Sequence, residues 1–497
     1  MQPRQRQILL TVSVAVFMAS LDLFIVNIAF PEIARDFGDA DVAELSWVLN
    51  AYAIVFAALL VAFGRVADRV GRKRGFIAGL GVFLVGSALS GLAPTLELLV
   101  AARVLQAAGA AVLVPTSLAL LLPEFEGAER AKAIGIWAAV GGIAAAAGPP
   151  IGGLLVEGSW RLVFLVNVPV GLAAIVAASR VLRESRDEHA RWPDWIGAGV
   201  LTVSVGAVAL ALVKAPDWGW ADRTTLGAFA AGALGLVWFW ERSGRHDSPV
   251  VDRGMLRVRS FALANVAALL FFVSFAAMLL TGVLFMTGVW GDSILRAGLQ
   301  LSPGPAMAAL FAGIAGRAAA RTEQRHLAGA GGAIFSVGTL WWLWQLDADA
   351  SYAAGMLPGM IVTGIGVGLV LPSLAGAAAS SLPPARFATG SAVFSMSRQL
   401  GSVLGVAVLV AILGADTTNF DGAYAFEAGV AALAAVAAFA IGPLRAAAPA
   451  APAAASPTGA ASPAGAASPA GATSPAGAAS PAGAASPKLA ATAEAAS

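Results

Sequence analysis

Long apolar runs decide what this chain can fold into. Fourteen runs long enough to cross a lipid bilayer follow one another between residues 8 and 443, with short polar segments between them. Hydrophobic residues make up 58% of the chain and charged residues 12%, about half the charged share of a soluble domain. Only an all-α membrane protein of many spans fits this pattern. The expected spans are roughly 8–30, 46–63, 75–93, 97–122, 133–155, 162–182, 195–213, 223–240, 261–287, 298–316, 327–346, 352–373, 387–413 and 422–443.

The distribution of lysine and arginine supports this count and gives an orientation. The segment Gly64–Arg74, GRVADRVGRKR, holds five basic residues between the second and third runs, which marks it as cytoplasmic under the positive-inside rule. With the N-terminus also inside, the inner segments hold 23 basic residues and the outer segments five. An odd number of spans would reverse the later segments and remove this bias. We therefore expect fourteen spans in the plasma (inner) membrane, with both termini in the cytoplasm.

Two parts of the chain resemble each other. Residues 109–119, GAAVLVPTSLA, in the fourth run are similar to residues 366–376, GVGLVLPSLAG, in the twelfth. A parallel repeat would place a substrate site at the midplane between two related halves; chance similarity between small-residue helices is the alternative. The predicted organisation is a six-helix bundle at 1–185, a two-helix insertion with its linkers at 186–258, a six-helix bundle at 259–445 and a disordered Ala/Ser/Pro/Gly repeat tail at 446–497.

Asp22 is the most informative single residue, because it lies near the middle of the first run. A charge at the centre of a membrane helix costs about 2.5–3.5 kcal/mol on insertion scales. An acid in such a position faces a cavity, pairs with a base or takes up a proton. We expect Asp22 to carry protons, with a structural hydrogen bond or ion pair between helices as the alternative.

Arg103 and Gln106 lie about one turn apart in the fourth run, on the same helix face. Arginine is permanently charged, so Arg103 near Asp22 would hold the carboxylate ionised until a proton or a cationic substrate displaced it. An arginine that extends to the membrane interface is the alternative. Arg398 and Gln399, near the centre of the thirteenth run, could line a cavity or pair across the halves. The predicted cavity residues are Asn27, Gln106, Arg398 and Gln399.

Two further segments have a distinctive residue spacing. The fifth run contains Gly148, Pro149, Gly152 and Gly153, and small residues with prolines favour a close-packed, bent helix at a rocking interface. In the basic segment, Asp68 can accept hydrogen bonds from arginine or backbone donors and bridge two helices when an inner gate is closed. A solvated basic loop would explain the charge there but not the glycine spacing.

Several classes of function are disfavoured. The chain has no cysteine, which excludes disulfides and thiolate metal sites, and its three histidines fall in segments expected to be cytoplasmic loops. GIGVG at 364–368 lies inside an apolar run, and no phosphate-binding GxxxxGK[ST] motif is present. We expect no enzyme activity, no cofactor, no metal and no nucleic-acid partner, and an ion gradient as the energy source.

Five motifs together resemble the drug:proton antiporters of the major facilitator superfamily, in particular its fourteen-helix branch. They are LDLFIVNIAFP (21–31), GRVADRVGRKR (64–74), RVLQAAGAA (103–111), GPPIGGLLVEGSWRLVFLVNVPVG (148–171) and SRQLGSVLGVAV (397–408). The resemblance covers roughly residues 8–443. It implies that Asp22 couples to protons and that Arg103 assists. It also implies a conformational loop formed by Gly64, Asp68, Arg69, Gly71 and Arg72, and an antiporter motif formed by Gly148, Pro149, Gly152 and Gly153.

The chain departs from the family pattern at several positions. Phe24 stands where threonine is usual, and Ala107 where glycine is usual. The second-half counterpart of the basic segment, 316–327, keeps its arginines but lacks the acid. We also expect no second acid centrally in the C-terminal half, which argues against a preference for dicationic drugs.

The sequence therefore predicts a monomeric, proton-coupled exporter of amphipathic small molecules such as drugs or antibiotics, working by alternating access. Its expected partners are a small-molecule substrate, protons and the lipid bilayer. Dedicated export of one natural product or metabolite is an alternative. A non-transporting membrane scaffold or sensor that uses the tail to bind partners is a second alternative.

Overall fold

Helices form the regular structure of this chain. The computed structural model describes residues 1–38, 40–187, 190–319, 321–383, 386–414 and 418–442, and these ranges contain no strand. The all-α prediction is confirmed. The predicted tail at 446–497 lies outside the described residues.

Every predicted run is helical. The first six runs correspond to α1 (Pro3–Asp36), α2 (Val42–Val70), α3 (Arg72–Gly91), α4 (Leu96–Leu121), α5 (Gly127–Gly158), and α6 (Leu162–Leu165) with α7 (Asn167–Val181). The next two correspond to α8 (Trp195–Trp218) and α9 (Arg223–Ser243). After the short α10 (Arg253–Leu256), the last six correspond to α11 (Arg259–Leu284), α12 (Ile294–Leu301) with α13 (Pro303–Ala318), α14 (Gln324–Gln345), α15 (Leu357–Ser380), α16 (Phe387–Leu413) and α17 (Phe420–Phe439). A 3-10 turn at Leu122–Glu124 and π-helical turns at Phe285–Val289 and Tyr352–Met356 extend three of these helices.

Twelve helices in the described part of the chain are long and apolar enough to cross a membrane. The two predicted runs outside this set are the one that coincides with α9 and the one that coincides with α12 and α13. α13 has 16 residues, fewer than the roughly 20 of a typical span, and Ser302 separates it from α12. The fold class holds, and the count of fourteen spans stays a prediction.

Local side chains set several helix boundaries. Asp41, Thr95 and Asp194 each accept a hydrogen bond from a backbone N–H group in the first turn of α2, α4 and α8. α2 ends at Gly71, whose φ of 131° is rarely adopted by other residues. A Cβ atom at Gly71 would also lie 2.8 Å from the carboxyl group of Glu184. Glycine is therefore required where the chain turns from α2 into α3.

Two sets of helices pack in the same order. We call α1 to α7 the N-bundle and α11 to α17 the C-bundle. α4 packs against α2 and α3, just as α15 packs against α13 and α14. α1 contacts α5 and α7, just as α11 contacts α16 and α17. This shared order of neighbours is what a parallel repeat of six helices requires.

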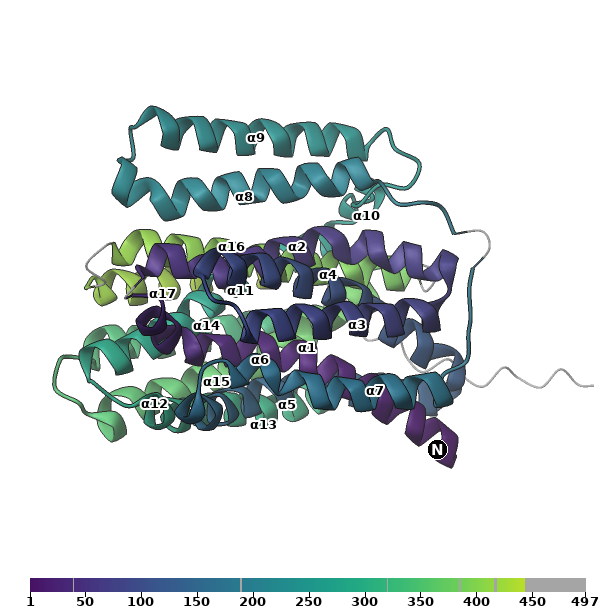
Figure 1. Ribbon diagram of the computed structural model, residues 1–497, viewed down its shortest axis with the longest axis horizontal. Helices are drawn as coiled ribbons and strands as arrows, with labels where there is room; N and C mark the ends of the chain where they lie inside the picture. The colour runs from purple at the N-terminus through teal and green to yellow at the C-terminus, as the bar shows by residue number, and fades with distance from the viewer. Residues whose placement is uncertain (39, 188–189, 320, 384–385, 415–417, 443–497) are drawn as a thin grey trace, which may run out of the picture. The chain divides into compact units, whose positions relative to one another are not determined.

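The two bundles meet along a limited set of helices. α2 contacts α16, α5 contacts α12 and α13, and α1 contacts α11. The inserted helix α8 packs against both α2 and α16, and α9 packs on α8, so that the two inserted helices form an outer pair in Figure 1. The insertion therefore covers one seam between the bundles.

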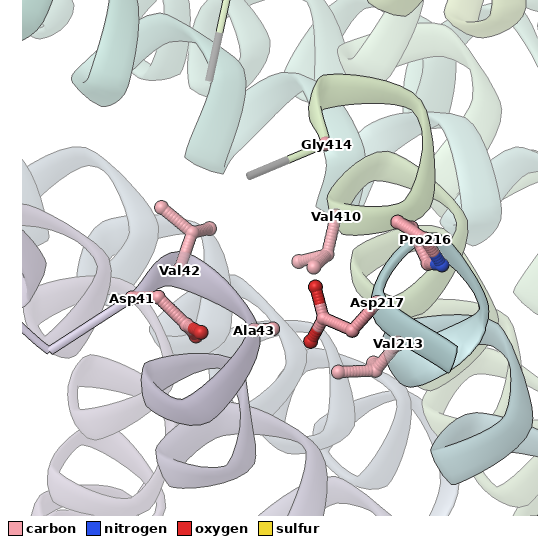
Figure 2. A pocket seen from close by; sticks show the side chains of 8 residues that line it. All are labelled: Asp41, Val42, Ala43, Val213, Pro216, Asp217, Val410 and Gly414. Carbon is pink, nitrogen blue, oxygen red and sulfur yellow. The ribbon is translucent and has the colours of Figure 1, made fainter. Parts of the chain in front are cut away.

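The ends of α2, α8 and α16 meet at the end of the helices opposite to Gly64–Arg74. Figure 2 shows a small pocket there, with Asp41 and Asp217 on opposite sides. Its volume of about 10 Å³ holds one water molecule at most. Side chains of both bundles and of the insertion thus meet around this pocket.

A buried ion pair joins α8 to α9 near the Gly64–Arg74 end. Nε of Arg242 donates to both carboxylate oxygens of Asp194 at 2.9 Å, and the Asp194 side chain is 1% exposed. The same carboxylate caps α8 by accepting from the N–H group of Gly197. One acid therefore starts α8 and holds α9 against it.

Glycines set the close approach of α3 to α4. A Cβ atom at Gly109 would overlap the backbone of Phe83, and one at Gly86 would lie 2.5 Å from the backbone nitrogen of Gln106. Small residues at helix crossings let backbones approach in this way. The approach brings Oγ of Ser87 within 3.3 Å of Nε2 of Gln106.

We predict that Gly109→Ala destabilises the folded protein by about 1–3 kcal/mol, because the added methyl group has no space against the backbone of α3. Gly81→Ala on α3 is the matched control, since a Cβ atom there meets nothing within 4 Å. The check is denaturant unfolding of both purified variants in detergent. Equal free energies of unfolding for the two variants would show that α3 and α4 do not pack as closely as described here.

Candidate functional site

A buried ion pair lies inside the N-bundle. Nη1 of Arg103 on α4 donates to Oδ2 of Asp22 on α1 at 2.5 Å, and the two side chains are 1% and 0% exposed. Nη1 also donates to Oε1 of Gln106 at 2.7 Å, and Nε2 of Gln106 donates to Oδ1 of Asp22 at 2.8 Å. Both oxygens of Asp22 are therefore occupied, as a buried carboxylate requires. The structure brings together three of the residues singled out from the sequence.

Arg103 is enclosed by groups that stabilise a positive charge. Its Nε donates to the backbone carbonyl of Val48 at 3.2 Å. Its guanidinium carbon lies 4.2 Å from the ring centre of Tyr52 and 5.6 Å from that of Phe164. Cation–π contacts of this kind are strongest where water is excluded. Arg103 thus faces the bundle interior rather than the membrane interface.

A chain of polar side chains extends from the ion pair to α7. Ser87 accepts hydrogen bonds from Nε2 of Gln106 at 3.3 Å and from Nδ2 of Asn167 at 3.0 Å, and it donates to the carbonyl of Phe164 at 2.8 Å. All three polar side chains are buried. A change of charge at Asp22 would therefore alter hydrogen bonds on α1, α3, α4 and α7 together.

The other predicted cavity residues lie outside the polar cluster, by which we mean Asp22, Arg103, Gln106, Ser87 and Asn167. Nδ2 of Asn27 donates to the carbonyl of Leu23 on its own helix at 2.8 Å. The guanidinium carbon of Arg398 lies 4.5 Å from the ring centre of Phe272 on α11. Nε of Arg398 and Nε2 of Gln399 have no hydrogen-bond partner among the described residues. The cluster therefore belongs to the N-bundle, and the polar pair on α16 is separate from it.

One face of the 148–153 segment packs on α1. A Cβ atom at Gly148 would lie 2.6 Å from Cβ of Phe24, and one at Gly152 would lie 3.0 Å from Cγ1 of Ile25. These two glycines are four residues apart and so share a face of α5. α5 thus contacts α1 two and three residues beyond Asp22.

The adjacent face of the same segment packs on α12 of the C-bundle. A Cβ atom at Gly153 would lie 3.0 Å from Cα of Leu295. One at Gly298 would lie 2.5 Å from the carbonyl oxygen of Pro149. The four predicted motif residues therefore join α1 on one side to the C-bundle on the other.

The predicted conformational loop joins α2, α3 and α4. Nε of Arg72 at the start of α3 donates to Oδ1 of Asp68 at the end of α2, at 2.7 Å. A Cβ atom at Gly64 would lie 3.3 Å from Cβ of Pro115 on α4. Asp68 thus bridges the two helices that the sequence expected it to bridge.

The linker after α7 closes on the same loop. Nη1 of Arg69 donates to the carbonyl of Ala190 at 2.8 Å. The carboxylate of Glu184 accepts from the N–H groups of Lys73 at 3.0 Å and Arg74 at 3.2 Å, at the N-terminus of α3. A carboxylate there complements the helix dipole. This role could not be predicted from the sequence, because Glu184 lies in a linker of mixed charge and resembles a solvated acid.

The expectation that the C-terminal half has no central acid is wrong. Glu427, about two turns into α17, is fully buried, and Thr281 on α11 donates to its Oε1 at 2.7 Å. Its Oε2 and the hydroxyl of Tyr424 have no partner among the described residues. The acid was missed in the sequence because it lies within an otherwise apolar run.

We predict that Asp22→Asn lowers the free energy of unfolding by about 3–5 kcal/mol, because it leaves the permanent charge of Arg103 buried without a partner. Arg103→Gln should cost less, because the remaining carboxyl can take up a proton. The double variant should recover most of the loss. Denaturant unfolding of the purified variants in detergent measures all three. Additive losses in the double variant would contradict the pairing.

Known proteins match this chain over most of its length. The family model of the Major Facilitator Superfamily matches residues 12–406. The chain is 33% identical over 409 residues to multidrug resistance protein Stp of Mycobacterium tuberculosis, covering 82% of this chain and 75% of Stp. It is 34% identical over 408 residues to the tetracenomycin C resistance and export protein of Streptomyces glaucescens, covering 81% and 74% of the two chains.

Two further likenesses agree. The cephamycin export protein CmcT of Amycolatopsis lactamdurans is 34% identical over 424 residues, covering 84% of this chain and 86% of CmcT. The crystal structure of the human organic anion transporter MFSD10 aligns with a TM-score of 0.62 and 15% identity, covering 88% of this chain and 100% of that one, a likeness of fold alone. The chain therefore belongs to the Major Facilitator Superfamily, as a multi-pass membrane transporter and not an enzyme.

Proposed function

We propose that this protein exports amphipathic small molecules such as drugs or antibiotics across the plasma membrane in exchange for protons. The observation that carries the proposal is the buried Asp22–Arg103 ion pair, whose second carboxylate oxygen is held by Gln106. An acid beside a fixed cation is suited to take up and release a proton. The resistance and export proteins among its relatives support drug export.

Proton uptake by Asp22 would remove one charge of the pair. Two unit charges about 4 Å apart attract by roughly 4 kcal/mol at an effective dielectric constant of 20. Losing this attraction would change the free-energy difference between two arrangements of the bundles by up to about the same amount, which is enough to favour one arrangement over the other. Asp22 would load from outside and release its proton to the cytoplasm.

α1 offers a route from the proton site to the second bundle. Asp22 forms its ion pair with Arg103 of α4. Phe24, two residues further along α1, packs against Gly148 of α5, and its ring centre lies 6.5 Å from that of Phe275 of α11. α5 in turn contacts α12 through Gly153. A small shift of α1 would therefore be transmitted to the α1–α11 and α5–α12 contacts between the bundles. This is the arrangement that alternating access by two rocking bundles needs.

We assign the Gly64–Arg74 end to the cytoplasm, with both termini there and fourteen spans, from the excess of basic residues. The bridge from Arg72 to Asp68 and the hydrogen bond from Arg65 to Ser248 fasten the N-bundle and the insertion at this end. We propose that this loop moves as one unit with the N-bundle, and that the protein works as a monomer.

Dedicated export of one natural product is a second candidate. Two of the relatives are named as the exporters of single antibiotics, tetracenomycin C and cephamycin. Efflux tests over a broad panel of compounds separate the two candidates, since a dedicated exporter would move none of an unrelated panel.

We predict that Asp22→Asn abolishes proton-coupled efflux in inverted vesicles, down to the level of vesicles without the protein, because the variant side chain takes up no proton. Proton release and dye efflux are measured together over a panel of lipophilic cations, anions and neutral drugs. Asp349→Asn, at an exposed position between α14 and α15, is the matched control and should behave as wild type.

The double variant Asp22→Asn with Arg103→Gln separates lost coupling from lost folding, since its unfolding is expected to resemble that of wild type. Coupled efflux at the wild-type rate in either Asp22 variant would rule out Asp22 as the proton carrier.

We predict that a disulfide between Gly153→Cys and Leu295→Cys forms readily and stops transport, because it fixes the α5–α12 contact. The chain contains no native cysteine, so the same double variant before oxidation and after reduction is its own control. Efflux is measured with copper-phenanthroline as oxidant and again after dithiothreitol. Full efflux in the crosslinked protein would show that α5 and α12 do not separate during transport.

A further inference from the structure

We propose that Arg398 and Gln399 bind the acidic group of an anionic aromatic substrate at the seam between the two bundles. This inference rests on the proposed export function and adds the charge of the molecule exported. The structure assigns the site from an uncompensated cation, two free N–H donors and a row of phenylalanine rings.

Arg398 is a cation without an anion. It lies near the middle of α16, and no carboxylate forms an ion pair with it among the described residues. The contrast with Arg103 is direct, because Arg103 has Asp22, Gln106 and Val48 as acceptors. A permanent charge in a membrane span without a counter-charge is costly, and the ring of Phe272 offsets only part of that cost. A bound anion would supply the missing charge.

The free donors at this position fit an acidic group. Nε of Arg398 and Nε2 of Gln399 have no acceptor in the described part of the chain, and Gln399 is 6% exposed. Ser397, the residue before them, is instead used within the C-bundle, where it donates to Asn265 of α11 at 2.9 Å. A guanidinium with a free Nε–H group matches a carboxylate, phenolate or sulfonate by charge-assisted hydrogen bonds. The amide of Gln399 offers a second free donor on the adjoining side of α16.

The phenylalanine rings connect Arg398 to the N-bundle. The guanidinium carbon of Arg398 lies 4.5 Å from the ring centre of Phe272. The ring centres of Phe272 and Phe275 are 5.7 Å apart, and those of Phe275 and Phe24 of α1 are 6.5 Å apart. Phe271 stacks on Phe275 at 6.0 Å. The row of rings therefore runs from Arg398 to the contact between α1 and α11. A flat aromatic body would pack among these rings.

The buried acids of the two bundles offer little to a cationic substrate. Asp22 already accepts hydrogen bonds from Arg103 and Gln106 on both of its oxygens. Glu427 keeps one carboxylate oxygen, Oε2, without a partner among the described residues, but the side chain is 0% exposed between α17 and α11, where Thr281 donates to Oε1 and Ser274 to the backbone carbonyl. The free charge beside the seam is thus positive.

The test compares fluorescein, an anion, with rhodamine 123, a cation built on the same xanthene ring system. Fluorescence anisotropy measures binding of each dye to the purified full-length protein in detergent. Wild type should bind fluorescein more tightly than rhodamine 123. Arg398→Gln should weaken fluorescein binding by about tenfold or more and change rhodamine 123 binding by less than about twofold, as expected for loss of a charged hydrogen bond.

Two further variants make the test specific. Arg398→Lys keeps the charge and should retain part of the fluorescein affinity. Arg317→Gln removes an exposed arginine at the end of α13 and should bind both dyes as wild type does. Thermal unfolding of each variant confirms that it is folded.

The outcomes separate this inference from the proposed function. Tighter binding of rhodamine 123 by wild type, no fluorescein binding, or an equal loss of both dyes in Arg398→Gln would each overturn the inference. Proton-coupled efflux of rhodamine 123 could still stand in those cases and would preserve the export function. Fluorescein binding that depends on Arg398 supports the inference even if Asp22→Asn vesicles disprove proton coupling.

Discussion

A charge placed in the middle of a membrane must be compensated, and the Asp22–Arg103 pair meets this constraint inside the N-bundle. Gln106 occupies the second carboxylate oxygen, and Tyr52 covers the guanidinium. The close approach of α3 to α4 through glycines brings Ser87 to Gln106 and completes the polar chain. Hydrogen bonds therefore link one buried carboxyl group to side chains of three other helices, and for this reason we propose the pair as a switch.

The two bundles repeat their helix packing but not their charges. The N-bundle contains an ion pair with both carboxylate oxygens occupied. In the described part of the chain, the C-bundle holds Arg398 without a counter-charge and Glu427 enclosed between helices. α1 connects the two bundles, because it carries Asp22 and also contacts α5 and α11. In this account one bundle handles the proton and the seam beside the other handles the substrate.

The sequence predicts the helices well, because span length and hydrophobicity are local properties. It also predicts that Arg103 and Gln106 act together, since residues three apart share a helix face. It could not find Tyr52 or Ser87 as partners, because the rotation of one helix against another depends on the whole packing. Phe24 stood out only as a departure from the family pattern, and the structure shows what it contacts. The count of fourteen spans stays open because α9 and the α12–α13 pair lie outside the twelve clear spans.

Proton coupling through Asp22 requires this carboxyl group to change its protonation during the working cycle. Infrared difference spectroscopy of the purified protein, with and without a transported dye, observes the C=O stretching band of a protonated carboxyl group directly. We expect a band in wild type that is missing from the Asp22→Asn spectrum and unchanged in Asp349→Asn. Identical difference spectra for wild type and Asp22→Asn would show that Asp22 keeps one protonation state, and the ion pair would then be a structural element only.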